Sequence, residues 1–258
     1  MARRKPGWIP DQHGAWAMLT LPFALGAAEA VRAGVAGWWI APLFAFWMLG
    51  YFAFHAASGW LKAAPRRRPA YLKPLVTYAG ASAAAGVVTL ALGGLGMAGW
   101  VLAYLPLLVP ALWLASRRRE RATLGGALTV AAACLMTLVL RFPHPQALLT
   151  AGPDAAAAAL LAAGLFAYFF GTVLYVKTNI RERGSRAFLI ASIGWHAAAT
   201  LAAAVLAASG LAASWWTAFF AATTVRAAAV PGRGWTPKRI GLIEAGFCVV
   251  LCVCDLVW

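Results

Sequence analysis

The 258-residue sequence is short of charge, and of negative charge above all. Charged residues make up 11% of the chain, whereas soluble domains carry roughly 25%. Asp and Glu number only 7, against 22 Lys and Arg. The chain therefore lacks the polar side chains that would cover a water-facing surface. The short alternating segments of a membrane β-barrel are missing as well, so the composition excludes both a soluble domain and a barrel.

Cysteine is also scarce. The four cysteines, Cys134, Cys248, Cys252 and Cys254, all lie inside apolar runs, so we expect no disulfides. Cys248 and Cys252 share a helical face, but no histidine or acidic partner follows at the spacing of a metal site. We interpret the cysteines as small buried apolar residues. The sequence implies neither a metal site nor a cofactor.

What the chain does contain is a series of long apolar runs. Apolar residues make up 63% of the sequence, and runs of about 20 residues recur from end to end. The first run lacks an A-x-A cleavage motif, so we expect it to remain as a span. The pattern predicts an all-α, polytopic membrane protein with one domain over residues 1–258, which begins with a short cytoplasmic segment, 1–13. The nine predicted spans are 14–32, 38–60, 75–93, 97–115, 122–140, 155–176, 187–208, 211–229 and 240–258.

The basic residues indicate how these spans are oriented. Five basic segments precede the first span and follow or close the second, fourth, sixth and eighth; outside them lie only Arg32 and Arg141. Nine spans place all five segments on one side of the membrane, and the positive-inside rule makes that side cytoplasmic. We therefore predict a cytoplasmic N-terminus and an external C-terminus. Such loops attract anionic headgroups, so the expected partners are membrane lipids. Nucleic acid is not expected, because no soluble basic face with interleaved aromatics exists.

The first group of polar residues lies directly before the first span, within WIPDQHGAWAM (8–18). Asp11, Gln12 and His13 carry groups that are unfavourable in hydrocarbon, so they should face water, protein or a ligand. If the protein is an enzyme, His13 is the first choice for a general base, with Asp11 orienting it and Gln12 binding the ligand. The alternative is that Asp11 caps a helix that begins near Gly14.

Three ionisable residues lie within later spans. His55 and His196 are each the only strongly ionisable group in their helical interior, and Glu244 lies about one turn inside the ninth span. Such residues are functional candidates. The alternative for each histidine is a neutral imidazole that hydrogen-bonds between helices. A three-histidine metal site is not favoured, because no two histidines have the i, i+3 or i+4 spacing.

A second group of polar residues lies in YVKTNIRERGSR (175–186). Here Asn179, Arg181, Glu182 and Arg186 follow the sixth span, and Gly184 permits a turn. Guanidinium groups bind phosphate bidentately, so this segment is a candidate anion site, joined by Lys73 from the second basic segment. Two simpler interpretations stay open: an i, i+4 salt bridge between Glu182 and Arg186, and loop charges that contact headgroups.

Four segments resemble a known family: WIPDQHGAWAMLTLPFALG (8–26), YLKPL (71–75), YVKTNIRERGSRAFLIASIGWH (175–196) and PKRIGLIE (237–244). They are similar to the YwiC-like family of bacterial membrane proteins over nearly the whole chain. This resemblance implies a multi-pass protein of the bacterial cytoplasmic membrane and implies no reaction.

The layout is more distantly similar to UbiA-type intramembrane prenyltransferases, in which nine spans surround a cavity and the working loops follow the second and sixth spans. Those enzymes hold magnesium with two Asp-rich motifs. Here residues 55–71 contain no acidic residue and the second loop offers only Glu182, so magnesium-dependent prenyl transfer does not fit.

The leading hypothesis is therefore a UbiA-like bundle with a cytoplasm-facing polar pocket. Its ligand would be an amphipathic, prenyl-type lipid with an anionic head, and Arg and Lys would replace magnesium as the counter-charge. The residues predicted to line the pocket are Asp11, Gln12, His13, His55, Asn179, Arg181, Glu182, His196 and Glu244. The alternatives are a secondary transporter or proton-coupled carrier, with His55, His196 and Glu244 as relay groups, and a non-catalytic membrane scaffold.

Overall fold

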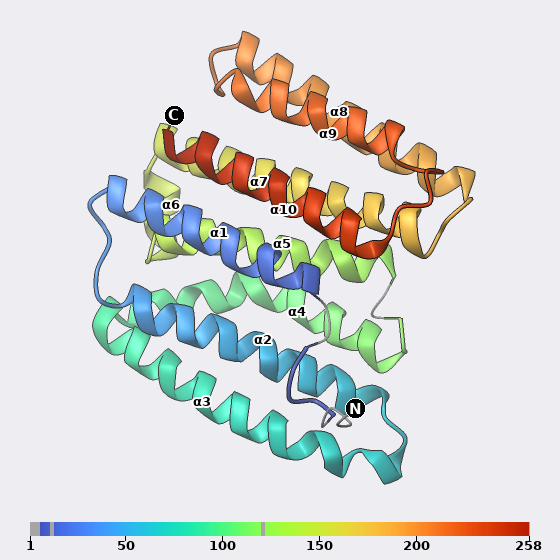
Figure 1. The fold of residues 1–258 in the computed structure, drawn as a ribbon. Coiled ribbons are helices and arrows are strands. Elements are labelled where there is room, and N and C mark those ends of the chain that lie inside the picture. Colours follow the sequence, from blue (N-terminus) through green and yellow to red (C-terminus); the bar gives the residue numbers. More distant parts are fainter. Residues whose placement is uncertain (1–5, 11–12, 120–121, 258) are drawn as a thin grey trace. The chain divides into compact units, whose positions relative to one another are not determined.

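The computed structural model describes residues 6–10, 13–119 and 122–257, with His13 described by its backbone alone. Every regular element in these residues is helical (Figure 1). The all-α prediction is confirmed. The chain divides into two compact units, residues 1–152 and 153–258, which we call the N-terminal unit and the C-terminal unit and describe separately. The prediction of one domain over residues 1–258 stays a prediction.

The helices follow the apolar runs closely. Those of the N-terminal unit are α1 (His13–Arg32), α2 (Ile40–Lys62), α3 (Pro69–Gly93), α4 (Val101–Ser116), α5 (Thr123–Arg141) and the short α6 (Pro145–Thr150), with 3-10 turns at η1 (Pro65–Arg67) and η2 (Leu95–Trp100). Those of the C-terminal unit are α7 (Pro153–Ile180), α8 (Arg186–Ala208), α9 (Trp215–Ala229) and α10 (Pro237–Val257).

Each predicted span corresponds to a helix. Among the described residues, 8 helices are long and apolar enough to cross a membrane, with η2 and α4 counted as one. The eighth predicted span, 211–229, forms α9, which has only 15 residues and is not among these 8. At about 1.5 Å per residue it is roughly 22 Å long, shorter than a hydrocarbon core of about 30 Å. The chain is thus a multi-pass membrane protein.

Small residues let the helices of the N-terminal unit approach closely. A Cβ atom on Gly26 of α1 would lie 2.7 Å from the Thr137 Cα atom of α5, so the two backbones are nearly in contact. The segment before α1 is also held in place, because the Tyr78 hydroxyl of α3 donates to the Trp8 carbonyl oxygen at 2.8 Å. Trp8 is therefore held against α3.

In the C-terminal unit, two connections meet at one end. The turn between α7 and α8 contains Gly184 at φ +85°, a conformation that favours glycine, and Ser185 then caps α8 by accepting from the Phe188 amide. Residues 230–236 join α9 to α10. The Arg183 guanidinium donates to the Trp235 carbonyl oxygen at 3.5 Å, which joins the two connections. One end of all four helices is therefore shared.

Candidate functional site

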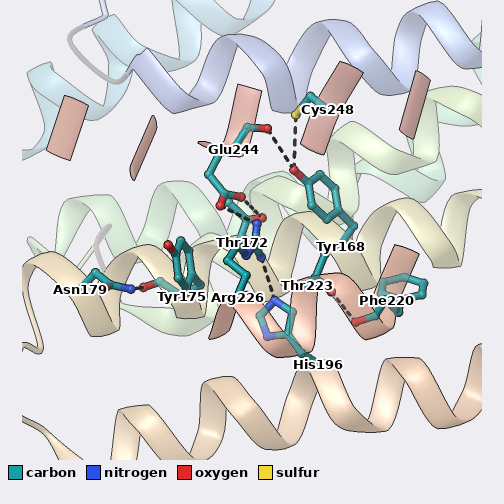
Figure 2. Close-up of polar contacts among 10 residues, drawn as sticks. All are labelled: Tyr168, Thr172, Tyr175, Asn179, His196, Phe220, Thr223, Arg226, Glu244 and Cys248. Atoms are coloured by element: carbon teal, nitrogen blue, oxygen red, sulfur yellow. Dashed lines mark hydrogen bonds and ion pairs between the residues drawn. The ribbon is translucent and has the colours of Figure 1, made fainter. Parts of the chain in front are cut away.

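Polar side chains from all four helices of the C-terminal unit meet in its interior (Figure 2). They are Thr172 on α7, His196 on α8, Arg226 on α9 and Glu244 on α10, and we call them the polar cluster. The residues His196, Arg226 and Glu244 are 1%, 5% and 9% exposed. Ionisable groups buried this deeply in a membrane protein are unfavourable unless they are paired, so such sites are usually functional.

Arg226 is the centre of the polar cluster. Its Nη1 donates to Glu244 Oε1 at 2.5 Å, and its Nη2 donates to His196 Nε2 at 3.1 Å. The Thr172 hydroxyl donates to the other carboxylate oxygen, Oε2, at 2.8 Å. Both oxygens of Glu244 are therefore satisfied, and its charge is balanced by the guanidinium. The low dielectric of the interior makes such a pair strongly coupled.

The hydrogen bonds of His196 define its protonation. Its Nδ1 lies 2.7 Å from the Ser192 carbonyl oxygen, which can only accept, so we assign the proton to Nδ1. Nε2 then holds a lone pair and accepts from Arg226. The imidazole is thus neutral and hydrogen-bonds between helices, which was the simpler of the two interpretations from the sequence. The polar cluster carries one positive and one negative charge, with no net charge.

Aromatic side chains enclose the guanidinium of Arg226. Its central carbon lies 4.4 Å from the ring centroid of Tyr175 and 4.7 Å from that of Phe247, both within cation–π range. On the other side of Glu244, the Tyr168 hydroxyl lies 3.3 Å from the Glu244 carbonyl oxygen, to which it donates, and 3.5 Å from Cys248 Sγ. Aromatic rings thus pack against both partners of the ion pair.

A layer of apolar side chains separates the polar cluster from the shared helix ends. This apolar layer consists of Tyr175, Ala227, Val230 and Ile240, with Trp235 packed against it. Val230 follows Arg226 by four residues and Ile240 precedes Glu244 by four, so the layer lies one helical turn nearer the connections. The ion pair is closed off from that end in this structure.

Beyond the apolar layer the unit is strongly basic. We call the exposed cations of the two connections and the adjoining helix ends the basic rim: Arg181, Arg183, Arg186, Arg233, Lys238 and Arg239. The half-buried Trp235 lies among them, with the Arg239 guanidinium 4.0 Å and the Arg233 guanidinium 5.9 Å from its ring. Glu182 is the only acidic residue in the two connections. The basic rim thus combines a large positive charge with an indole ring.

The structure brings together two of the predicted site residues and places four others at the basic rim or beside the apolar layer: Asn179, Arg181, Arg186 and Glu182, which is half-buried in the turn after α7. His196 and Glu244 meet through Arg226. Asn179 is buried, and its side-chain amide donates to the Tyr175 carbonyl oxygen at 2.8 Å (Figure 2). Arg181 and Arg186 are exposed on the basic rim. The ligand-binding roles of these residues stay predictions.

The remaining predicted residues lie elsewhere. His55 is half-buried in α2 and Lys73 is exposed on α3, both in the N-terminal unit. Asp11, Gln12 and the side chain of His13 lie outside the described residues, so their predicted roles stay predictions. Among the residues that the structure does describe, no group of three or more His, Cys, Asp and Glu could hold a metal ion.

Two interpretations from the sequence change. The i, i+4 pairing of Glu182 with Arg186 assumes a continuous helix, but α7 ends at Ile180 and Arg186 begins α8, so that spacing argument is wrong. Arg226 was counted with the basic residues that close the eighth span and mark the cytoplasmic side, but its side chain is buried inside the unit. The sequence around Arg226, TTVRAAAV, indicates that this residue lies inside a helix, because the first helix-breaking residue, Pro231, comes five positions later.

Fold and site together define a multi-pass α-helical membrane protein with a buried ionic cluster. The profile of the family described as YwiC-like protein matches residues 9–141. The chain is also 30% identical over 250 residues, 95% of this chain and 97% of the relative, to a Bacillus subtilis (strain 168) protein described as "Uncharacterized protein YwiC". The chain therefore belongs to the YwiC-like family. No solved structure matches it.

The family profile and the polar cluster lie in different parts of the chain. The matched residues, 9–141, fall within the N-terminal unit, whereas the polar cluster and the basic rim belong to residues 172–244. The similarity to the Bacillus relative extends over 95% of the chain and so includes most of the C-terminal unit. The likeness to UbiA-type enzymes stays a prediction.

Proposed function

We propose that the protein binds an amphipathic, prenyl-type lipid with an anionic head, and that the head lies on the basic rim. The observation that carries this proposal is the composition of the basic rim: it has six exposed cations, three of which contact the half-buried Trp235, and Glu182 is the only carboxylate in the connections. A phosphate head would be held by arginine in place of a metal ion, because guanidinium groups match its oxygens bidentately.

The indole ring adds a second reason. Tryptophan favours the membrane–water boundary, so Trp235 suits a position at the level of the headgroups. Each basic residue near an anionic surface contributes about 1 kcal/mol. Arg183 and Arg239 both contact residue 235, through its carbonyl oxygen and its ring, so these two cations are held in place. A fixed pair favours a specific head over diffuse attraction.

The same proposal includes an orientation. The basic rim lies at one end of the C-terminal unit, and the positive-inside rule assigns that end to the cytoplasm. We accordingly propose a bacterial cytoplasmic membrane location, with the N-terminus inside and the C-terminus outside. Labelling of cysteines introduced near Arg67 and Arg183 tests this. Both should react from the cytoplasmic side, and labelling from opposite sides would contradict it.

Lipid retention measures the binding. The protein is purified in mild detergent, and the lipids that co-purify with it are identified by native mass spectrometry. We expect a defined anionic lipid to be retained by the wild type and lost in Arg183→Gln/Arg239→Gln. The matched control is Arg66→Gln/Arg67→Gln, which removes two exposed cations from a basic loop of the N-terminal unit. An equal loss in both variants, or retention of bulk phospholipid alone, contradicts the proposal and favours a scaffold with diffuse headgroup contacts.

A second function is favoured by a separate observation, the contact of His196, Arg226 and Glu244 within the bundle. In a proton-coupled carrier such groups would relay protons or bind the substrate. Proteoliposomes with an imposed pH gradient test this. A carrier should move protons or an anion, and His196→Ala should abolish this transport. His144→Ala, the matched control in an exposed loop, should leave it unchanged. Equal behaviour of the two variants would exclude the carrier.

A further inference from the structure

We infer that Arg226 is an internal binding site for the singly charged phosphate head of a phosphodiester, and that the head enters with one proton, which Glu244 takes up. The inference rests on the proposed binding of an anionic head, and it assigns that head a second position beneath the apolar layer. In the present structure the Glu244 carboxylate occupies the anion's place on the guanidinium.

Charge balance is the first argument. The polar cluster holds one guanidinium, one carboxylate and one neutral imidazole. A second anion in this low-dielectric interior would leave a net negative charge, which is strongly unfavourable. If a proton from water binds the carboxylate as Arg226 leaves it, an O–H bond forms on Glu244 and Nη1 becomes free for the phosphate. The sum of charges stays zero, so uptake of one anion requires one proton.

Unused hydrogen-bonding groups are the second argument. Arg226 Nε is buried and has no hydrogen-bond partner among the described residues, and the same holds for the hydroxyls of Tyr175 and Ser192. Buried donors normally have partners. Tyr175 lies against the guanidinium, and Ser192 supplies the carbonyl oxygen that orients His196. A phosphate group has oxygens to spare for such donors, whereas the Glu244 carboxylate leaves Nε unused.

The surroundings of Glu244 restrict which group takes the proton. The titratable and charged residues facing it are Tyr168 and Tyr175 from α7, His196 from α8, Arg226 from α9 and Cys248 from α10 itself. His196 accepts from Arg226 on Nε2, and a second proton there would remove that bond and place two cations in contact. Glu244 can take the proton instead, because its Oε1 is free to bind it once Arg226 has left, while Thr172 still donates to Oε2.

The route from the basic rim also follows from the contacts. Arg183 Nε donates to the Asn179 carbonyl oxygen at 3.1 Å, and the Asn179 amide donates to the Tyr175 carbonyl oxygen one turn further in. Tyr175 then faces Arg226. Polar groups therefore line α7 from the basic rim to the polar cluster, and the Val230 and Ile240 side chains of the apolar layer are what must move aside.

Proton uptake on binding tests the inference. The full-length protein in detergent, weakly buffered and containing a pH-indicator dye, is titrated with dioctanoyl phosphatidylglycerol or with dimethyl phosphate, and the amount bound is measured in parallel. Both probes are phosphodiesters that stay singly charged, so neither takes up a proton itself. We expect one proton per bound probe. Uptake with both shows that the head suffices, and uptake with the lipid alone assigns the site to lipids. Binding without uptake overturns the inference.

Two variants separate this result from misfolding. Glu244→Gln cannot ionise, so it should bind the probe without proton uptake and independently of pH, whereas wild-type affinity should fall about tenfold per pH unit once Glu244 is ionised. Arg226→Lys keeps the charge, so it should bind more weakly with unchanged proton stoichiometry. If Glu244→Gln shows the same proton uptake as the wild type, the proton acceptor is another group and the inference is wrong.

The basic rim variant distinguishes the two proposals. Arg183→Gln/Arg239→Gln should weaken binding of the lipid probe but leave one proton per bound molecule. If it changes neither binding nor uptake, the basic rim is not the outer position of the head, while the assignment of Arg226 stands. If it abolishes lipid retention while the wild type binds without proton uptake, the basic rim does bind the head and the assignment of Arg226 is wrong.

Discussion

Removing one partner of the Arg226–Glu244 pair should destabilise the protein far more than removing both. The Glu244→Leu variant leaves a guanidinium buried against Tyr175 and Phe247, with His196 as its one remaining polar partner among the described residues. Charges about 4 Å apart interact by roughly 4 kcal/mol at an effective dielectric constant of about 20, and breaking buried pairs typically costs about 3–5 kcal/mol. We expect a loss in that range. The double variant Arg226→Met/Glu244→Leu should lie within about 1 kcal/mol of the wild type, because no uncompensated charge remains.

Equilibrium unfolding in mixed micelles, followed by tryptophan fluorescence, measures the four free energies of this double-mutant cycle. The matched control is the exposed pair of Arg32 and Glu29, which has a similar N–O distance of 2.6 Å but side chains that are 41% and 25% exposed. Glu29→Gln should cost less than about 1 kcal/mol, because solvent screens the pair. If the Arg226 and Glu244 variants are additive within about 0.5 kcal/mol, the two side chains are not coupled and the described polar cluster is wrong.

Three further predictions use the same unfolding measurement. Thr172→Val removes a hydroxyl that donates to the Glu244 carboxylate and should cost about 1.5–3 kcal/mol, whereas an unchanged stability would show that the carboxylate finds another donor. Ile240→Ala empties part of the apolar layer and should cost about 2–5 kcal/mol, and a neutral result would mean that the layer is not packed. Gly184→Ala should destabilise the protein by about 1 kcal/mol, because φ there is +85°. The control is Gly194→Ala, in an open position inside α8, which should be neutral or stabilising. Equal effects of the two substitutions would contradict the described turn.

The helices were predictable because their signals are local. Apolar runs of about 20 residues mark the spans, and the turn after Ile180 is marked by Gly184 within the charged segment RERGSR. The span 211–229 shows where this reasoning is least complete. Its run is mostly apolar up to Arg226, but α9 begins only at Trp215, because residues 211–214 continue the turn that follows α8.

The site was predictable only in part, and the reason is physical. His196 and Glu244 stood out because an ionisable group in an apolar span needs a partner. Their contact depends on how four helices are rotated, and these helices are apolar and rich in Ala and Gly on every side, so no polar face shows the rotation. Arg226 was missed because it also fits the loop-charge pattern that gave the orientation. The carboxylate of Glu244 in the next span along the chain was the one sign that Arg226 has a buried partner.

Infrared difference spectroscopy tests the central claim most directly, because it detects the protonated carboxylic acid itself. Spectra of the protein in lipid films are recorded before and after addition of dioctanoyl phosphatidylglycerol. A carboxylic-acid band should appear on binding in the wild type and be missing in Glu244→Gln, with the guanidinium bands of Arg226 shifting at the same time. A wild-type spectrum without that band, or a band that persists in Glu244→Gln, would contradict the exchange of Glu244 for an anion on Arg226.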